Sequence, residues 1–179
     1  MWISGGLVAT PSYEYAVTGF DSTYLQWVEN GASPYLGAVD YPTNWIYQLE
    51  GGNKKEGNFS FADSTMAQQA ETLTKVELSI RRYDEDSPDT GAPVLRAYVW
   101  DGSAWTYFDV PASLFAWAWK TVDITSVIDT WAKLDGCKIY LSVVVGPGGL
   151  SAVDAAKLIA TTTVPSKKKP VGDGLTFAI

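Results

Sequence analysis

The sequence predicts an all-β domain, an antiparallel jelly-roll β-sandwich with one short helix. Three observations lead to this fold class. Segments that alternate apolar and polar residues recur along the chain, turn-forming residues separate them, and only one segment has the apolar spacing of a helix. Together they give about eight to ten short strands, which suits two packed antiparallel sheets.

Four candidate strands lie in the first third of the chain. They are residues 9–17 (ATPSYEYAV), 23–28 (TYLQWV), 44–50 (NWIYQLE) and 57–61 (GNFSF). Aromatic and β-branched residues are frequent in all four, and such side chains favour the extended backbone. Turn-forming residues lie between them, so we expect short strands joined by loops.

The clearest alternation is in residues 73–82 (LTKVELSIRR), which predicts a half-buried strand. A second strand covers residues 92–100 (APVLRAYVW), with Pro93 near its start, where a missing N–H is tolerated. Asp101-Gly102 then predicts a hairpin turn into residues 103–110 (SAWTYFDV).

Three further strands complete the set. Residues 116–124 (AWAWKTVDI) alternate, and residues 137–145 (CKIYLSVVV) are rich in β-branched side chains. The alanines of residues 150–164 (LSAVDAAKLIATTTV) suit a helix, but alternation suits a strand, and we favour the strand. The residues expected to point inward are Val76, Leu78, Ile80, Ile139, Leu141 and Val143.

One short helix is predicted over Ser126–Leu134. Thr125 or Ser126 can cap its start, Asp129 follows Ser126 by three residues, and Gly136 can end it. The apolar stripe on this helix consists of Val127, Ile128, Trp131 and Leu134. We expect Trp131 to be a core residue beneath an edge of the sandwich.

Length and composition describe one globular domain. Of 179 residues, 46% are apolar and 18% charged, enough to bury a core. We expect the sandwich over residues 1–164 and an extended C-terminal arm over residues 165–179, where the composition changes sharply.

The net charge of -7 argues against direct nucleic-acid binding. We also expect no membrane span, because no segment approaches the ~20 apolar residues that one requires. The start lacks the basic and apolar regions of a secretory signal, so either a signal was removed before this numbering or the protein is used without Sec export, and Met1 favours the second.

Catalytic groups are scarce. The chain has no histidine and a single cysteine, Cys137, so histidine triads, disulfides and most zinc sites are excluded. No acidic pair stands out as the two carboxylates of a glycosidase. We therefore expect a protein that is not an enzyme and uses no cofactor, with Cys137 as a small buried side chain.

The densest acidic segment is residues 81–91 (RRYDEDSPDTG). Its oxygen-rich side chains make Asp84, Asp86 and Asp89 candidates for a calcium site. The D-x-D-x-D-G spacing of a calcium loop is missing. We therefore favour a solvated turn and predict no metal.

The aromatic residues around the predicted hairpin have two arrangements open to them. Tyr98 and Trp100 share a strand face with Arg96, whereas Leu95, Ala97 and Val99 form the other, and either face could be inward. We expect most tryptophans in the core, and at least one of Trp100 and Trp105 pinning neighbouring strands from inside. The remaining aromatic surface is expected to meet another protein chain, with sugar stacking as the alternative.

Residues 57–164 resemble a known kind of domain. The segments GNFSF, TLTKVELSIRRY, VLRAYVWDGSAW and WKTVDITSVIDTWAKLDGCKIYLSVVV occur in the order seen in jelly-roll modules of viral structural proteins and microbial cell-surface proteins. Those modules include DNRLRE-type domains and related carbohydrate-binding modules. Their W-x-x-x-D-[IV]-T-x-x-[IV]-x-x-W segment is matched here by Trp119, Asp123, Ile124, Thr125, Ile128 and Trp131. The resemblance implies a non-catalytic surface or assembly role, and no ligand residue carries over.

These observations lead us to expect a structural protein of a repeating assembly, a virion capsid or decoration protein. Its partners would be copies of itself and other structural proteins of the same assembly, and it would be located in the virion. The alternative is a carbohydrate-binding or adhesion module of a cell-surface protein. Apolar and basic tails could form the assembly interface, by adding a strand to a neighbour or by folding back on their own sheet. The residues predicted for it are Trp2, Ile3, Lys167, Lys168, Lys169, Leu175, Phe177 and Ile179.

Overall fold

The computed structural model describes residues 10–25, 27–31, 36–39, 41, 43, 45–48, 52–86, 88, 91–145 and 149–164. The predicted C-terminal arm lies outside these residues. The domain boundary at residue 164 therefore stays a prediction.

Within the described residues the chain forms ten strands and two short helices. The strands are β1 (Ser12–Leu25), β2 (Val28–Asn30), β3 (Trp45–Gln48), β4 (Gly52–Phe61), β5 (Thr72–Glu85), β6 (Val94–Trp100), β7 (Trp105–Val110), β8 (Ala118–Asp123), β9 (Lys138–Val145) and β10 (Leu150–Thr163). The helices are α1 (Met66–Gln69) and α2 (Trp131–Asp135). The all-β prediction is confirmed, and so is the strand, rather than a helix, at residues 150–163.

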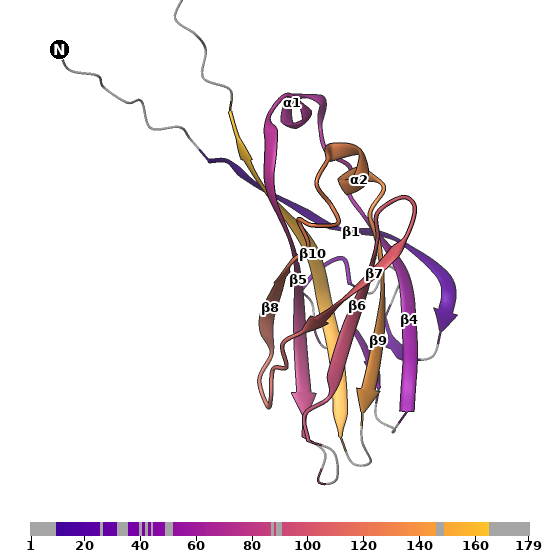
Figure 1. Cartoon of the computed structure of the whole chain (residues 1–179). Coiled ribbons are helices and arrows are strands. Elements are labelled where there is room, and N and C mark those ends of the chain that lie inside the picture. The colour runs from indigo at the N-terminus through magenta and orange to yellow at the C-terminus, as the bar shows by residue number, and fades with distance from the viewer. Residues whose placement is uncertain are drawn as a thin grey trace, which may run out of the picture.

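The strands form two antiparallel layers (Figure 1). In one, called here the β10 sheet, the order is β2-β3-β10-β5-β8. In the other, the β9 sheet, the order is β4-β9-β6-β7. Strand β1 belongs to both, because residues 12–16 pair with β10 and residues 17–25 pair with β4. The crossing of β1 joins the two layers along one edge.

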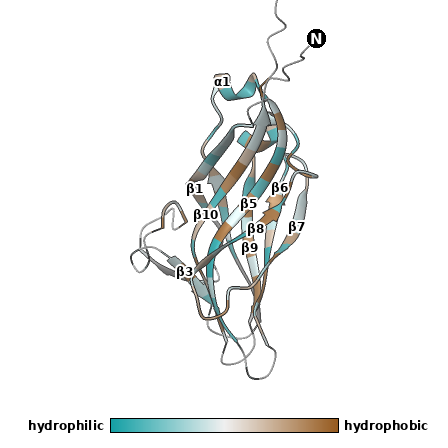
Figure 2. Ribbon diagram, turned by 90° about the vertical axis from the view of Figure 1, so that its left-hand side faces the viewer, coloured by the Kyte–Doolittle hydropathy of each residue, from teal (hydrophilic) through white to brown (hydrophobic). Residues whose placement is uncertain are grey.

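The core lies between the layers and is made by strand alternation. Figure 2 shows hydrophobic and hydrophilic residues alternating along β5 and β10. The six residues predicted to point inward, Val76, Leu78, Ile80, Ile139, Leu141 and Val143, are all 0% exposed, which confirms that prediction. Full burial of each such side chain contributes about 1.5–3 kcal/mol.

The open choice on β6 is settled in favour of the aliphatic face. Leu95, Ala97 and Val99 are fully buried, so Tyr98 and Trp100 point outward. The hairpin predicted at Asp101-Gly102 joins β6 to β7, and Gly102 adopts a φ of 99°, which favours glycine. The Asp101 carboxylate accepts hydrogen bonds from the N–H groups of Ser103 and Ala104, which lowers its pKa.

The prediction that most tryptophans fill the core is wrong for the described residues. Only Trp27 is buried among them, whereas Trp105 and Trp119 are 37% and 38% exposed. Leucine, isoleucine, valine and alanine fill the space between the sheets, and the strand tryptophans occupy positions that face outward. Trp131 is intermediate: it packs against the core, and its Nε1 donates to the Glu71 carbonyl at 3.0 Å.

The predicted helix begins later than expected. Helix α2 starts at Trp131 and is capped by Thr130, so neither Thr125 nor Ser126 is its cap. The Thr125 side chain contacts β5 instead, because its Oγ1 accepts a hydrogen bond from the Val76 N–H at 2.9 Å. This contact ties the segment before α2 to β5. A single turn forms there, in which the Ile128 N–H donates to the Ile124 carbonyl at 2.9 Å, but it does not continue into α2.

Helix α1 was not predicted. Thr65 caps it, and Thr65 and Gln68 form a reciprocal capping box. The Thr-x-x-Gln spacing is a sequence signal for such a box. It was missed because the four residues that follow Thr65 carry no apolar stripe.

Among the described residues, Arg82 and Asp84 form the one ion pair in which both side chains are 0% exposed. The Arg82 Nη1 also donates to the Val110 carbonyl at 2.8 Å. The Asp84 carboxylate accepts from the Ser113 N–H at 2.7 Å and from the Ser151 hydroxyl at 2.8 Å. Burial lowers the pKa of Arg82, and the neighbouring Asp84 charge opposes that change.

Substitution of Asp84 by alanine should strongly destabilise the fold. It leaves the buried Arg82 cation without its carboxylate, at a cost of about 3–5 kcal/mol in the free energy of unfolding. Urea denaturation measures this value directly. The matched control is Asp86→Ala, on the same segment but exposed, which should change it by less than ~0.5 kcal/mol. Equal urea midpoints for D84A and wild type would contradict the role given to the pair.

Candidate functional site

Alternation along β5 decides which side chains reach the outer face of the β10 sheet. Because Arg82 and Asp84 point into the core, Tyr83 and Glu85 point outward. Tyr83 lies opposite Ala152 of β10, and Glu85 lies opposite Leu150. This face therefore combines a tyrosine, a carboxylate and two small or aliphatic residues.

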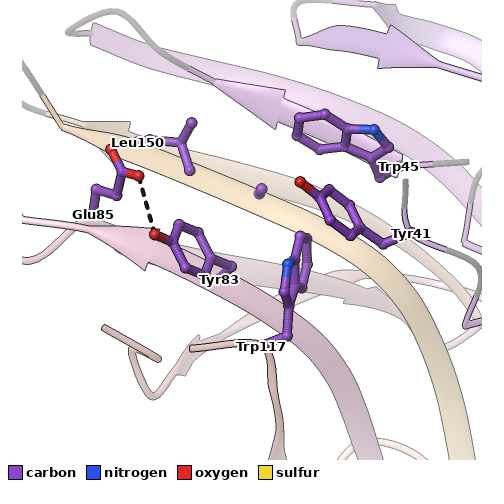
Figure 3. Close-up of a pocket in the computed structure, with 7 residues that line it drawn as sticks. Tyr41, Trp45, Tyr83, Glu85, Trp117 and Leu150 are labelled. Carbon is purple, nitrogen blue, oxygen red and sulfur yellow. Dashed lines mark hydrogen bonds between the residues drawn. The ribbon is translucent and has the colours of Figure 1, made fainter. Parts of the chain in front are cut away.

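An aromatic pocket of about 270 Å³ lies on this face (Figure 3). Its lining residues come from β3, β5 and β10 and from the chain before β3 and just before β8. They are Tyr41, Trp45, Tyr83, Glu85, Trp117, Leu150 and Ala152. Four of the seven are aromatic, so the pocket is a hollow walled by flat rings.

The rings around the aromatic pocket support one another. The Tyr41 ring centroid lies 4.8 Å from that of Trp117 and 5.2 Å from that of Trp45. Tyr83 lies 5.7 Å from Trp117 on the other side, and Tyr47 stacks behind Trp45 at 4.5 Å. Such contacts restrict the rotamers of each ring before a ligand binds. Binding therefore costs less free energy for ordering these side chains.

Polar groups fix the walls of the aromatic pocket. The Tyr83 hydroxyl donates to the Glu85 Oε1 at 3.0 Å (Figure 3). That hydrogen bond is the main cause of the raised pKa of Tyr83. The Tyr41 N–H donates to the Asp154 Oδ1 at 3.0 Å, and Asp154 also pairs with Arg81. The Arg81 guanidinium lies 5.2 Å from the centre of the Trp117 ring.

A second hollow, the Trp119 pocket, lies on the same face and measures about 220 Å³. Its lining residues are Glu14, Ala16, Gly37, Ala38, Val39, Trp119, Ala155, Ala156 and Lys157. The Lys157 Nζ lies 4.7 Å from the centre of the Trp119 ring and 2.6 Å from the Glu14 Oε1. The lysine charge is thus balanced by a carboxylate.

The β9 sheet carries a separate row of rings on its own outer face. Trp100 and Trp105 lie opposite each other across the hairpin, 5.3 Å apart, which confirms the predicted cross-strand pair. Tyr140 joins Trp105 at 4.9 Å and stacks on Tyr98 at 4.4 Å. The prediction that one of the two tryptophans lies inside is wrong, because Leu95, Ala97 and Val99 fill that side of β6.

The resemblance motif has a structural role. The Asp123 Oδ1 accepts from the Thr125 N–H at 2.9 Å, and Ile124 and Ile128 are fully buried. These contacts build the turn between β8 and α2. Trp119, the first residue of the motif, is half-exposed and lies in the second hollow.

Of the residues predicted for metal and assembly sites, only Asp84 and Asp86 are among the described residues, and neither lines the aromatic pocket or the Trp119 pocket. The Asp84 carboxylate is enclosed by Arg82, Ser113 and Ser151, whereas Asp86 is exposed. Asp89 and the predicted assembly residues Trp2, Ile3, Lys167, Lys168, Lys169, Leu175, Phe177 and Ile179 lie outside the described residues. Within the described ranges, no three acidic or cysteine side chains come close enough together to hold a metal ion.

Two other features of the described chain bear on chemistry. Burial raises the pKa of the Cys137 thiol to about 12, so the thiolate that a nucleophile requires is scarce at neutral pH. Both described helices are too short to cross a lipid bilayer.

Sequence reasoning missed the aromatic pocket. A signal existed for Tyr83 and Glu85, since they alternate with the inward positions of the best-predicted strand. No local signal existed for Tyr41, which reaches the pocket through a contact with a residue more than a hundred positions away.

No protein-family model matches this sequence, and no curated protein matches it. Among solved structures, the chain is similar to the carbohydrate-binding module TmCBM61, whose structure was solved in complex with β-1,4-galactotriose. The likeness has a TM-score of 0.41 and 16% sequence identity, and it covers 83% of this chain and 87% of that one. At this TM-score it carries no conclusion about the present chain, and the galactotriose is the ligand of that protein.

Removal of divalent metal should leave the stability of the protein unchanged. The Asp84 oxygens already accept hydrogen bonds from protein groups, which leaves Asp86 as the only described calcium candidate with an exposed carboxylate. Thermal melts with EDTA and with added CaCl2 should therefore coincide. A melting temperature that falls by several degrees with EDTA and recovers with calcium would show a native-state metal site.

Proposed function

We propose that this protein is a non-enzymatic carbohydrate-binding module, which binds neutral saccharides in the aromatic pocket. The observation that carries the proposal is the pocket itself, with four aromatic rings around a hollow of about 270 Å³. A pyranose ring offers apolar C–H faces and a rim of hydroxyl groups. Tyrosine and tryptophan match both, because each has a flat apolar body and a polar tip.

The polar groups of the pocket suit hydroxyl recognition. Glu85 and the Tyr83 hydroxyl are held by their mutual hydrogen bond, and a carboxylate has a second oxygen that can accept from a sugar hydroxyl. A few fixed polar groups within an aromatic lining are typical of small-molecule sites. The charge of Arg81 is balanced by Asp154, which favours a neutral ligand over an acidic one.

The number of acidic side chains in the aromatic pocket favours binding over hydrolysis. Glycoside hydrolysis requires two carboxyl groups on opposite sides of the scissile bond. Glu85 is the one acid among the described residues that line the aromatic pocket. The site can therefore hold a saccharide but lacks the second group that cleavage needs.

Trp117→Ala should abolish or strongly weaken saccharide binding. It removes the ring that contacts both Tyr41 and Tyr83, and loss of a central aromatic residue costs about 2 kcal/mol or more, roughly 30-fold in affinity. Affinity electrophoresis in gels containing galactan, xylan, mannan or mixed-linkage β-glucan measures the retardation. Wild-type protein that is retarded by none of these neutral polysaccharides would overturn the proposal.

Trp105→Ala is the control for that experiment. Trp105 lies on the outer face of the other sheet and is 37% exposed, so its removal should leave retardation unchanged. Thermal melts of both variants show whether each remains folded. Equal losses of retardation in W105A and W117A would mean that the effect does not come from the aromatic pocket.

Assembly with copies of the same chain is a second candidate function. The observation in its favour is the outer face of the β9 sheet, where exposed apolar side chains gather. They are Val94, Trp105, Tyr107 and Val144, which are 47%, 37%, 52% and 51% exposed. Val94 pairs with Val144 at one end of this face, and a row made of Arg96, Asp109 and Ser142 separates them from Tyr107 and Trp105. Exposed apolar side chains rimmed by polar residues are typical of protein–protein contact. Location in a virion rests on terminal residues outside the described part of the chain and stays a prediction, whereas a cell-surface location accords with saccharide binding.

Tyr107→Glu tests the assembly function. If the β9 sheet mediates self-association, the mass of the wild type measured by light scattering should rise with concentration. The variant should remain monomeric, because a carboxylate on that surface opposes its burial against a second copy. A wild type that stays monomeric at all concentrations would contradict assembly through this face.

A further inference from the structure

The aromatic pocket and the Trp119 pocket lie next to each other on the outer face of the β10 sheet. Trp119 is opposite Arg81, which in turn is opposite Ala155 of β10. Trp117 comes two residues earlier in the chain and lines the hollow around Tyr83. The Arg81 guanidinium lies 5.2 Å from the centre of the Trp117 ring, and Arg81 is also the register partner of Trp119, so both tryptophans lie next to Arg81.

A single stretch of chain borders both pockets. Val39 and its two preceding neighbours line the Trp119 pocket, and Tyr41 lines the aromatic pocket. This stretch is attached to β10, because the Ala156 N–H donates to the Leu36 carbonyl at 3.1 Å and the Tyr41 N–H donates to Asp154. Leu36 is fully buried, which anchors the stretch in the core. One side of both pockets is therefore built from residues 36–39 and 41, which hydrogen bonds attach to β10.

Ala152 of β10 lines one pocket and Ala155 lines the other. Between them in the strand, Val153 is buried and Asp154 pairs with Arg81, so the pair of Arg81 and Asp154 lies between the two hollows. The distance from Ala152 to Lys157 along the strand is about 16 Å at ~3.3 Å per residue. A single sugar ring is shorter than this span, so only a chain of linked sugars could reach both pockets.

We propose that the two pockets are the ends of one groove that binds an internal stretch of a neutral polysaccharide, with Trp117 and Trp119 as successive platforms for its sugars. This inference rests on the proposed carbohydrate-binding function.

The charges along the groove support a neutral chain. Arg81 lies between the two tryptophans and pairs with the buried Asp154, and Lys157 pairs with Glu14. Neither cation is left to attract an acidic sugar. The Arg81 side chain is 21% exposed, so its N–H groups can donate to a hydroxyl of the central sugar.

Chain length is the variable that tests the groove. Oligosaccharides of one to six sugars, cut from the polysaccharide that retards the wild type most, are titrated by calorimetry. The affinity of the wild type should rise about tenfold between one sugar and three or four, and then level off. An affinity that does not depend on length would overturn the groove but leave the proposed function intact. Absence of binding to every polysaccharide would overturn both.

Trp119→Ala should remove the gain that comes with length. Short oligosaccharides should bind it as they bind the wild type, and long ones about tenfold more weakly. Trp119→Phe keeps a smaller ring and should retain part of the gain. Thermal melts of both variants confirm that they are folded. Equal weakening of short and long ligands by W119A would contradict successive platforms.

Trp105→Ala is the matched control, since Trp105 and Trp119 are the same residue type and 37% and 38% exposed, on opposite sheets. The control should reproduce the wild-type dependence on length. The same loss in W105A as in W119A would show that the groove is not the source of the gain.

Discussion

The buried pair of Arg82 and Asp84 is the interaction on which the arrangement of this molecule depends. Both charges lie between the sheets without access to water, and such a pair is costly unless hydrogen bonds satisfy it. Here Ser113 and Ser151 donate to the carboxylate, and the Val110 carbonyl accepts from the guanidinium. The pair therefore requires one placement of β5 against β10 and the end of β7.

The same pair controls the chain that crosses from the β9 sheet to the β10 sheet. The Asp84 N–H donates to the Ser113 carbonyl, and the Phe115 N–H donates back to the Asp84 carbonyl, both at 2.9 Å. Phe115 has a φ of 57°, a conformation that residues other than glycine seldom adopt, and these bonds hold it there. Trp117 follows two residues later. The hydrogen bonds of Asp84 thus help to position a ring of the aromatic pocket, and strand alternation turns Tyr83 toward it.

The sequence predicted the features that depend on local periodicity. The alternation of residues 76–80 and 139–143 identified the inward side chains correctly, because a two-residue period allows only one buried face. It could not choose between the faces of β6, where tyrosine and tryptophan compete with leucine and valine. That choice depends on the width of the space between the sheets, which bulky rings would overfill.

The candidate site was less predictable than the fold. Tyr41 and Trp117 meet Tyr83 only after three distant segments come together, and no local pattern encodes that meeting. The start of α2 was misplaced for a related reason, since a contact between Thr125 and β5 overrides a local capping signal. The prediction of a solvated turn was also wrong for Asp84, because this carboxylate pairs with Arg82 in the interior.

Spectra of the tryptophan side chains test most directly whether the outer face of the β10 sheet binds saccharide. In 15N-labelled protein, each indole N–H gives its own signal, and single Trp→Phe variants assign them. On titration with a hexasaccharide from the polysaccharide that retards the protein, the signals of Trp117 and Trp119 should shift, and those of Trp100 and Trp105 should stay. Shifts of Trp100 and Trp105 alone would place the binding surface on the β9 sheet and contradict this account.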